Sequence, residues 1–210
     1  MDHTRIVSFD AEGTLVTPRF SEVIWHEALP ALFAEQRGIS LVEAKQQVFA
    51  AYGEVGDQRK EWYDIKYWFR RFGLTGYQSL LSNYRCEISY YDDVSQLLSE
   101  LSQRYELIVI SNSAREFLEL LMETKEVYFK AIFSAISDFE KLKSADLYLE
   151  ICRMLDVAPE EMVHVGDSWQ FDFDIPRNVG VRAIHLDRQG QRRGDDVVSN
   201  LTELGSKLLS

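Results

Sequence analysis

Two carboxylates follow an apolar run near the start of the chain. In the segment FDAEGTL at residues 9–15, Asp10 and Glu12 stand two residues apart, directly after the run at residues 6–9. A carboxylate can act as an oxygen nucleophile, transfer a proton, or bind a hard cation such as Mg²⁺. Acids and glycine are also common in ordinary loops, so the pair alone does not predict a site.

Further polar side chains stand where later apolar runs end. Ser111 and Asn112 follow the run at residues 106–110, and Asp167 and Asp172 follow the run at residues 162–165. Lys143 lies between these two groups. Taken alone, the serine is typical of a helix cap and the lysine of a solvated surface. Their order and spacing together indicate one site built from carboxylates, a hydroxyl and an ammonium group.

Alternating strand and helix patterns predict the scaffold for these groups. Short apolar runs, typical of strands covered on both faces, predict strands at residues 5–10, 106–110, 131–134, 162–165 and 181–186. Apolar residues at helical spacing predict helices at residues 92–105, 114–123, 145–155 and 201–209. This alternation favours an α/β fold with a parallel sheet and helices on both faces. The carboxyl ends of such strands gather functional groups at one edge of the sheet.

Residues 17–90 interrupt this alternation with a helical segment. Helical patterns at residues 22–37, 41–52 and 61–72 follow one another without an intervening strand. The segment is rich in large aromatic side chains, which we expect to form the core of a small bundle. Near the other end of the chain, the charged, glycine-containing stretch at residues 188–196 is expected to be a loop.

Composition limits the partners and the compartment. The 210 residues carry a net charge of -11, which disfavours binding to nucleic acid or to anionic membrane surfaces. No apolar run approaches the roughly 20 residues that span a bilayer, and residues 1–5 lack the layout of a signal peptide. Cys86 and Cys152 are expected to be buried free thiols, as in a reduced compartment. We therefore expect a soluble, cytoplasmic protein.

Four segments together resemble a known family. FDAEGTL, ISNS, Lys143 in LKSADLY, and VGDSWQFDFDIPRNVG look like the four motifs of the haloacid dehalogenase-like (HAD) hydrolase superfamily. The resemblance implies a Rossmann-like catalytic core, residues 1–16 and 91–210, and a helical cap, residues 17–90, inserted after the first motif. It also implies a Mg²⁺-dependent phosphatase that hydrolyses small phosphorylated metabolites through a phospho-aspartate.

The resemblance assigns roles to the carboxylates. Asp10 corresponds to the nucleophile, and Asp10 and Asp167 correspond to the two metal carboxylates. The backbone carbonyl of Glu12 would add a further ligand to the metal site. Asp172 takes the place of the second acid in the last motif, where it would complete the metal site by orienting water or a lysine. The Glu12 side chain occupies the position of the general acid and base.

The resemblance assigns phosphate recognition to a second group of residues. Ser111 and the backbone N–H groups that follow it, beginning at Asn112, would hold the phosphoryl oxygens. Lys143 would neutralise charge on the phosphoryl group and on the nucleophile. The cap is expected to close over the substrate and exclude water, which favours a small molecule over a phosphoprotein.

Glu12 departs from the phosphatase pattern, which has Asp at this position. One extra methylene moves the carboxyl by roughly 1.3 to 1.5 Å, and a displacement of that size can cost about 100-fold in rate. Two alternatives therefore stand beside the phosphatase. Ala11 next to a residue other than Asp resembles the dehalogenase branch, which cleaves 2-haloacids without a metal. A weakly active or non-catalytic protein that binds a phosphorylated ligand or a protein partner is the other alternative.

Overall fold

The sheet that carries the candidate residues is parallel throughout. The computed structural model describes residues 4–209, and its six-stranded sheet has the order β3-β2-β1-β4-β5-β6. The strands are β1 (Ile6–Phe9), β2 (Glu106–Ser111), β3 (Phe129–Ser134), β4 (Met162–Gly166), β5 (Arg182–Leu186) and β6 (Val197–Val198). Strand β1 therefore pairs with a neighbour on each side and lies inside the sheet.

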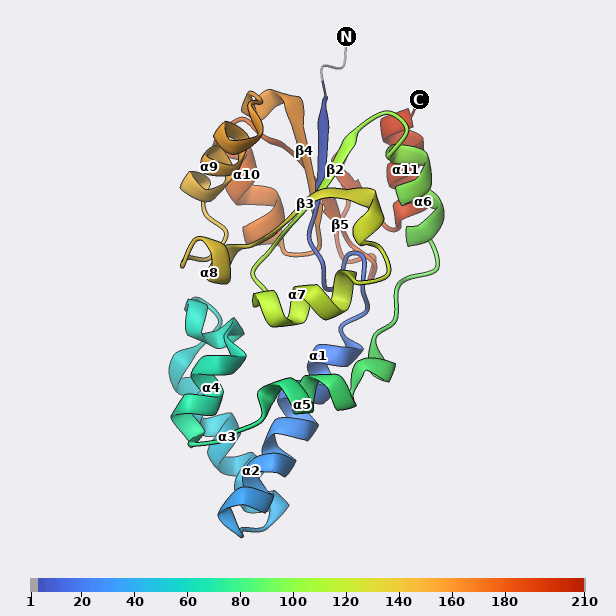
Figure 1. Ribbon diagram of the computed structural model, residues 1–210. Coiled ribbons are helices and arrows are strands. Elements are labelled where there is room, and N and C mark those ends of the chain that lie inside the picture. Colours follow the sequence, from blue (N-terminus) through green and yellow to red (C-terminus); the bar gives the residue numbers. More distant parts are fainter. Residues whose placement is uncertain (1–3, 210) are drawn as a thin grey trace.

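Apolar side chains cover both faces of the central strands. On one face, Ile6 and Ile108 belong to a buried cluster with the inner side of α9 (Ala145–Leu155). On the other face, Val7 and Val163 pack in a second cluster with α6 (Val94–Leu101), α7 (Arg115–Met122) and α11 (Leu201–Leu209). Figure 1 shows helices on either side of the sheet. The predicted α/β fold with a parallel sheet is confirmed.

Short helices and turns complete this part of the chain. They are η4 (Glu126–Tyr128), α8 (Ala135–Asp138), η5 (Pro159–Glu161), η6 (Trp169–Asp174) and α10 (Ile175–Arg177). Residues 188–196 form the predicted loop. Strand β6 was not predicted, because two residues are too short for a periodic pattern. It pairs with the last two residues of β5, His185 and Leu186.

An all-helical segment lies at the carboxyl end of the strands (Figure 1). Its elements are α1 (Arg19–Val23), η1 (Ile24–Ala28), α2 (Leu29–Arg37), α3 (Leu41–Val55), η2 (Lys60–Tyr63), α4 (Ile65–Phe72), α5 (Tyr77–Asn83) and η3 (Arg85–Glu87). Two linkers join this segment to the sheet, the first at residues 10–18 and the second at residues 88–93. They pair with each other, since the Thr17 N–H donates to the Ser89 carbonyl at 2.9 Å. The division into a core and a cap at the predicted boundaries stays a prediction. Within residues 4–209, no helix is long and apolar enough to cross a membrane.

Aromatic rings fill the interior of the helical segment. Trp68 is fully buried, and its ring stacks on Phe72 with 5.6 Å between the ring centres. Phe49 instead remains 41% exposed, because it lies on the outer side of α3. The prediction of two buried thiols is half wrong. Cys152 is buried in α9, whereas Cys86 is exposed in the short turn η3 that leads back to the sheet.

Asp93, at the start of α6, forms hydrogen bonds with the loop after β5 and with the start of α11. Loss of its charge should therefore destabilise the fold. Its carboxylate accepts two hydrogen bonds from Arg188, each 3.1 Å long, and one from the Leu201 N–H at 2.8 Å. We expect Asp93→Asn to lower the free energy of unfolding at pH 7 by about 1.5 to 3 kcal/mol, the usual range for bonds to a charged group. Asp92→Asn, at the exposed neighbouring acid, is the control and should change it by less than about 0.5 kcal/mol.

The pH dependence of this effect has a defined sign. Burial acts to raise the pKa of Asp93, but the Arg188 guanidinium and the Leu201 N–H outweigh it and lower the pKa. The stabilisation is therefore present at neutral pH and is lost as the pH falls below the ordinary aspartate pKa of about 3.9. Urea unfolding of both variants from pH 7 downward checks this. Equal losses of unfolding free energy in Asp92→Asn and Asp93→Asn at pH 7 would contradict the stabilising role of Asp93.

Candidate active site

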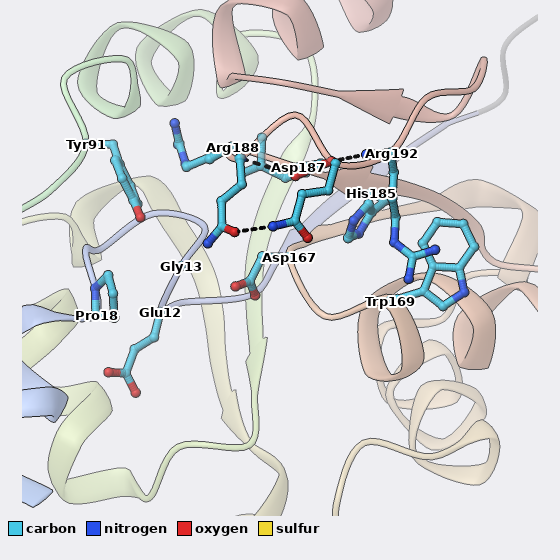
Figure 2. A pocket seen from close by; sticks show the side chains of 13 residues that line it. Glu12, Gly13, Pro18, Tyr91, Asp167, Trp169, His185, Asp187, Arg188 and Arg192 are labelled. Atoms are coloured by element: carbon cyan, nitrogen blue, oxygen red, sulfur yellow. Dashed lines mark hydrogen bonds between the residues drawn. The ribbon is translucent and has the colours of Figure 1, made fainter.

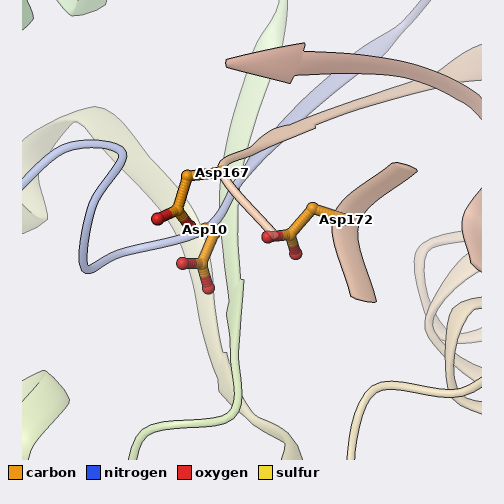
Figure 3. Close-up of side chains that lie close together, drawn as sticks. All are labelled: Asp10, Asp167 and Asp172. Atoms are coloured by element: carbon orange, nitrogen blue, oxygen red, sulfur yellow. The ribbon is translucent and has the colours of Figure 1, made fainter. Parts of the chain in front are cut away.

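Three aspartates meet at the carboxyl edge of the sheet. Asp10 directly follows β1, Asp167 follows β4, and Asp172 lies in η6. Each contributes a carboxylate oxygen to a group whose members all lie within 4.8 Å of one another (Figure 3). Pairing of β1 with β4 sets this proximity, since the Asp10 N–H continues the ladder by donating to the Val165 carbonyl at 2.8 Å. The structure thus brings Asp10 close to two aspartates that lie more than 150 positions further along the chain.

Lys143 bridges two of these carboxylates. Its ammonium lies 2.8 Å from Asp10 Oδ1 and also contacts Asp172 Oδ1, and the residue is 3% exposed. Burial acts to lower the pKa of Lys143, but the two carboxylates outweigh it and raise the pKa, which keeps the ammonium charged. Burial raises the pKa of Asp10, and the lysine opposes that rise.

Asp172 is held by three partners and serves as an anchor. Its Oδ1 faces Lys143 and lies 3.0 Å from His164 Nε2, while its Oδ2 accepts the Ser168 N–H at 2.9 Å. Burial acts to raise the pKa of Asp172, but the lysine outweighs it and lowers the pKa. The carboxylate is therefore ionised, and most of its lone pairs are already used.

His164 is a member of this network that the sequence did not predict. Burial lowers its pKa, so the ring is neutral. The Ser8 hydroxyl lies 2.5 Å from Nδ1, and donation to that atom leaves the ring proton on Nε2, facing Asp172. The alternation of side chains along β4 contained the signal, because His164 and Gly166 share one face of a strand that leads directly to Asp167.

Asp167 carries the charge that is least compensated. Its carboxyl receives no side-chain hydrogen bond from any residue between 4 and 209. Burial, with the nearby charges of Asp10 and Asp172, raises the pKa of Asp167 to about 7. Asp10 and Asp172 are buried, whereas Asp167 lies at the open side of the group. Carboxylates clustered in this way repel one another unless a cation lies between them. Their hard oxygen atoms are the ligands that Mg²⁺ prefers.

The segment after β2 lies beside the aspartates. Ser111 is 2% exposed, and its hydroxyl oxygen accepts the Ser113 N–H at 3.3 Å. The Asn112 side chain accepts the Lys143 N–H at 2.8 Å, so it positions the lysine's own loop. The structure therefore places Asn112 beside Lys143, and Ser111, the last residue of β2, directly precedes Asn112.

The Glu12 side chain turns away from the three aspartates. Its Oε2 accepts a hydrogen bond of 2.8 Å from the Ser113 hydroxyl, and Figure 2 shows the carboxyl pointing away from Asp167. Its Oε1 is buried and has no hydrogen-bond partner in the part of the chain that the structure describes. Burial raises the pKa of Glu12. The longer side chain thus reaches the segment after β2 and not the metal group.

The helical segment contributes Tyr63, which the sequence placed only among the bundle aromatics. Its hydroxyl donates to the Asp57 carbonyl at 3.2 Å. Burial raises its pKa to about 12, and the charges of Lys143 and Asp10 lie close enough to act on it. Nearby, Gln170 donates to the Gln58 side chain across 3.3 Å, from the core to the helical segment. Tyr63 follows no strand, so position at a sheet edge gave no signal for it.

Comparison with known structures places this arrangement among similar folds. The structure of a HAD phosphatase from Thermococcus onnurineus superimposes with a TM-score of 0.86 at 25% sequence identity, covering 98% of each chain. The structure of a 2-haloacid dehalogenase from Pseudomonas syringae superimposes with a TM-score of 0.71 at 20% identity, again covering 98% of each chain. The second similarity concerns the fold alone.

Sequence comparison gives the family. The chain is 22% identical to the glyceraldehyde 3-phosphate phosphatase of Pyrococcus furiosus, over 97% of this chain and 92% of that protein. It is 27% identical to the mouse N-acylneuraminate-9-phosphatase over 48% of this chain, and the match spans only 42% of that relative's length. The family description "haloacid dehalogenase-like hydrolase" matches residues 4–180, which is most of the sequence. With the four motifs, the fold and this match in agreement, the chain belongs to the haloacid dehalogenase-like hydrolase family.

Proposed function

We propose that this hydrolase is a Mg²⁺-dependent phosphatase of small phosphorylated metabolites that acts through a phospho-aspartate at Asp10. One observation carries the proposal. The Asp10 carboxylate lies at the centre of the site, with Lys143 at 2.8 Å on one side and Asp167 in the same oxygen group on the other. An oxygen nucleophile between a fixed cation and a cation-binding carboxylate suits attack on an anionic phosphoryl group.

The residues present fit a divalent cation. Asp10 and Asp167 would hold it, together with the Glu12 backbone carbonyl, while Asp172 keeps Lys143 in place. When bound there, Mg²⁺ would neutralise charge on the phosphoryl oxygens. Desolvation, and then the charges of Asp10 and Asp172, raise the pKa of Asp167, and a cation held between these carboxylates would favour their ionised forms.

Asp10 would perform the first chemical step. One of its oxygen atoms bonds to phosphorus while the bond from phosphorus to the substrate oxygen breaks, giving an aspartyl phosphate and an alcohol. Lys143 balances charge on the transferred group, and Ser111 with the N–H groups after it binds the phosphoryl oxygens. Water then attacks the phosphorus and releases phosphate and the free carboxylate.

Glu12 would move protons in both steps. The leaving oxygen needs a proton in the first step, and the attacking water must lose one in the second. Because the carboxyl is bonded to Ser113, it must rotate from that contact to reach the reacting oxygen. Its second oxygen forms no hydrogen bond of normal geometry among residues 4–209, although the nearby Ser21 hydroxyl acts on the carboxyl and lowers its pKa. The rotation must therefore break the bond to Ser113 and leave the vicinity of Ser21.

The relatives support phosphate over halide chemistry. The Pyrococcus furiosus relative, which this chain matches over nearly its full length, is a phosphatase of glyceraldehyde 3-phosphate, and the Thermococcus onnurineus structure is a phosphatase. The halide that leaves when a carbon–halogen bond is cleaved needs no proton, and that reaction needs no metal-binding carboxylates. The similarity to dehalogenase structures therefore adds nothing to the assignment beyond the fold.

Hydrolysis of p-nitrophenyl phosphate with and without Mg²⁺ tests the proposal. We expect turnover with Mg²⁺ and its loss on adding a chelator. Absence of turnover in the wild type, with none gained in Glu12→Asp, would reject the phosphatase. Release of halide from a 2-haloacid without metal would favour the dehalogenase. Binding of Mg²⁺ and phosphate in a thermal shift assay without any hydrolysis would indicate a non-catalytic protein.

Gly166 offers a steric test of the anchor. A Cβ added there would lie 2.6 Å from Cβ of Asp172 and would push that carboxylate off Lys143. Since a misplacement near 1 Å can cost about 100-fold, we expect Gly166→Ala to lower kcat/KM by about that factor. Gly53→Ala in α3 is the control, because nothing lies within 4 Å of the added atom. Equal activity of the two variants on p-nitrophenyl phosphate would contradict the role of Asp172.

A further inference from the structure

A cavity of about 450 Å³ opens beside Asp167, and the proposed mechanism does not use it (Figure 2). The loop after β5 forms one wall, and Tyr91 of the second linker and Trp169 at the start of η6 border the opposite sides. A volume of this size is typical of sites for small molecules. Because Asp167 belongs to both the cavity and the metal group, the cavity is continuous with the proposed reaction centre.

Two arginines lie on aromatic rings in the walls of this cavity. The Arg188 guanidinium carbon is 3.6 Å from the centre of the Tyr91 ring, and the Arg192 guanidinium carbon is 3.9 Å from the centre of the Trp169 ring. Stacking on a ring holds a guanidinium flat and leaves its edge, with the N–H donors, available to a planar anion.

Arg192 is the cation that lacks a counter-charge. Arg188 is paired with Asp93 through both terminal nitrogens. The carboxylate of Asp187, which also lines the cavity, accepts the backbone N–H groups of Gln189 at 3.1 Å and Arg192 at 2.5 Å. Within residues 4–209, the side chain of Arg192 forms neither an ion pair nor a hydrogen bond. The cavity wall therefore presents one guanidinium without a direct partner, while the carboxylate of Asp167 lies where the cavity meets the metal group.

Two buried polar atoms without partners belong to the same walls. Arg188 Nε and His185 Nδ1 both lack a hydrogen-bond partner in the described part of the chain, although both are buried. Buried polar atoms are nearly always satisfied in native proteins, so two exceptions in one cavity point to a polar ligand. The amides of Gln189 and Gln191, which bond to each other at 2.7 Å, add groups suited to hydroxyls.

We propose that this cavity binds the carboxylate at the far end of the substrate, which would then be a phosphorylated polyhydroxy acid. This inference rests on the proposed phosphatase function. In-line displacement places the leaving oxygen opposite Asp10, so the rest of the substrate must turn past Asp167 to enter the cavity. A chain of several carbons can make this turn. Its carboxylate would meet Arg192, and its hydroxyls would meet the two glutamine amides.

Matched substrates test the proposal. 6-Phosphogluconate and sorbitol 6-phosphate differ only in a carboxylate or a hydroxymethyl group at the end remote from the phosphate. We expect kcat/KM in the wild type to favour the acid by at least about tenfold, the usual effect of a charge-assisted hydrogen bond. Arg192→Gln should bring this ratio to about one, while Arg192→Lys keeps most of it because the charge remains. An unchanged ratio in Arg192→Gln, or no preference in the wild type, would overturn the proposal.

Arg193→Gln is the matched control, since Arg193 is exposed and does not line the cavity. It should leave both the ratio and the activity on p-nitrophenyl phosphate unchanged. Direct binding of gluconate, measured by calorimetry on the wild type and on Arg192→Gln, tests the carboxylate site independently of the phosphatase function. If the protein hydrolyses no phosphate ester but binds gluconate through Arg192, the proposed phosphatase function is wrong and the proposal that the cavity binds a carboxylate is supported. If gluconate binds but the substrate ratio is one, the anion is a separate ligand and the assignment to the substrate is wrong.

Discussion

Asp10→Asn is expected to abolish phosphatase turnover, with a loss of at least about 1,000-fold in kcat. The amide keeps the size of the side chain but has no negative oxygen to bond to phosphorus. The fold should survive, because Lys143 keeps its contact with Asp172 and because burial already disfavours the charge on Asp10. Hydrolysis of p-nitrophenyl phosphate under saturating Mg²⁺ measures the loss.

The control for this variant is Asp174→Asn. Asp174 is an exposed acid at the end of η6, and its substitution should leave turnover within about twofold of the wild type. A thermal unfolding scan of both variants shows whether either has lost its fold. If folded Asp10→Asn turned over at the wild-type rate, a different group would have to be the nucleophile.

Glu12→Gln is expected to give the second largest loss, and its size should depend on the leaving group. Removal of a general acid costs about 100- to 10,000-fold when the leaving oxygen needs a proton, as in an alkyl phosphate. p-Nitrophenolate is stable without a proton, so the loss on p-nitrophenyl phosphate should be smaller. Glu12→Asp, which restores the residue type of the phosphatase pattern, should keep turnover on both substrates.

Glycerol 3-phosphate and p-nitrophenyl phosphate, assayed side by side, measure this dependence. Glu22→Gln is the matched control, because Glu22 is an exposed acid of α1 outside the site. A loss in Glu12→Gln of the same size on both substrates would speak against proton transfer. It would indicate that the side chain matters only through its hydrogen bond to Ser113.

The positions of the candidate residues followed from the sequence because a simple rule connects them. Asp10 and Asp167 come directly after a strand and Ser111 is the last residue of one, and parallel strands bring their carboxyl ends to one edge. Short apolar runs located those strands well. The exposure of Cys86 and the two-residue strand β6 were not predicted, because neither a side chain in a short turn nor pairing at a strand end leaves a periodic pattern.

Side-chain direction could not be predicted in the same way. The sequence shows that Glu12 is one methylene longer than Asp, but only the packing of the segment after β2 turns its carboxyl toward Ser113. In the sequence, His164 is indistinguishable from the other residues of a buried strand, and only the structure shows that it contacts Asp172. Tyr63 depends on how the helical segment sits over the sheet, which no local pattern encodes.

The covalent intermediate is the most direct test of the account. The enzyme is mixed with substrate and Mg²⁺, quenched in acid during turnover, digested, and its peptides are analysed by mass spectrometry. We expect one phosphoryl group on the peptide that contains Asp10, absent without substrate and absent in Asp10→Asn. Turnover at full rate with no phosphorylated peptide, or with the group on Ser111, would contradict a mechanism through Asp10.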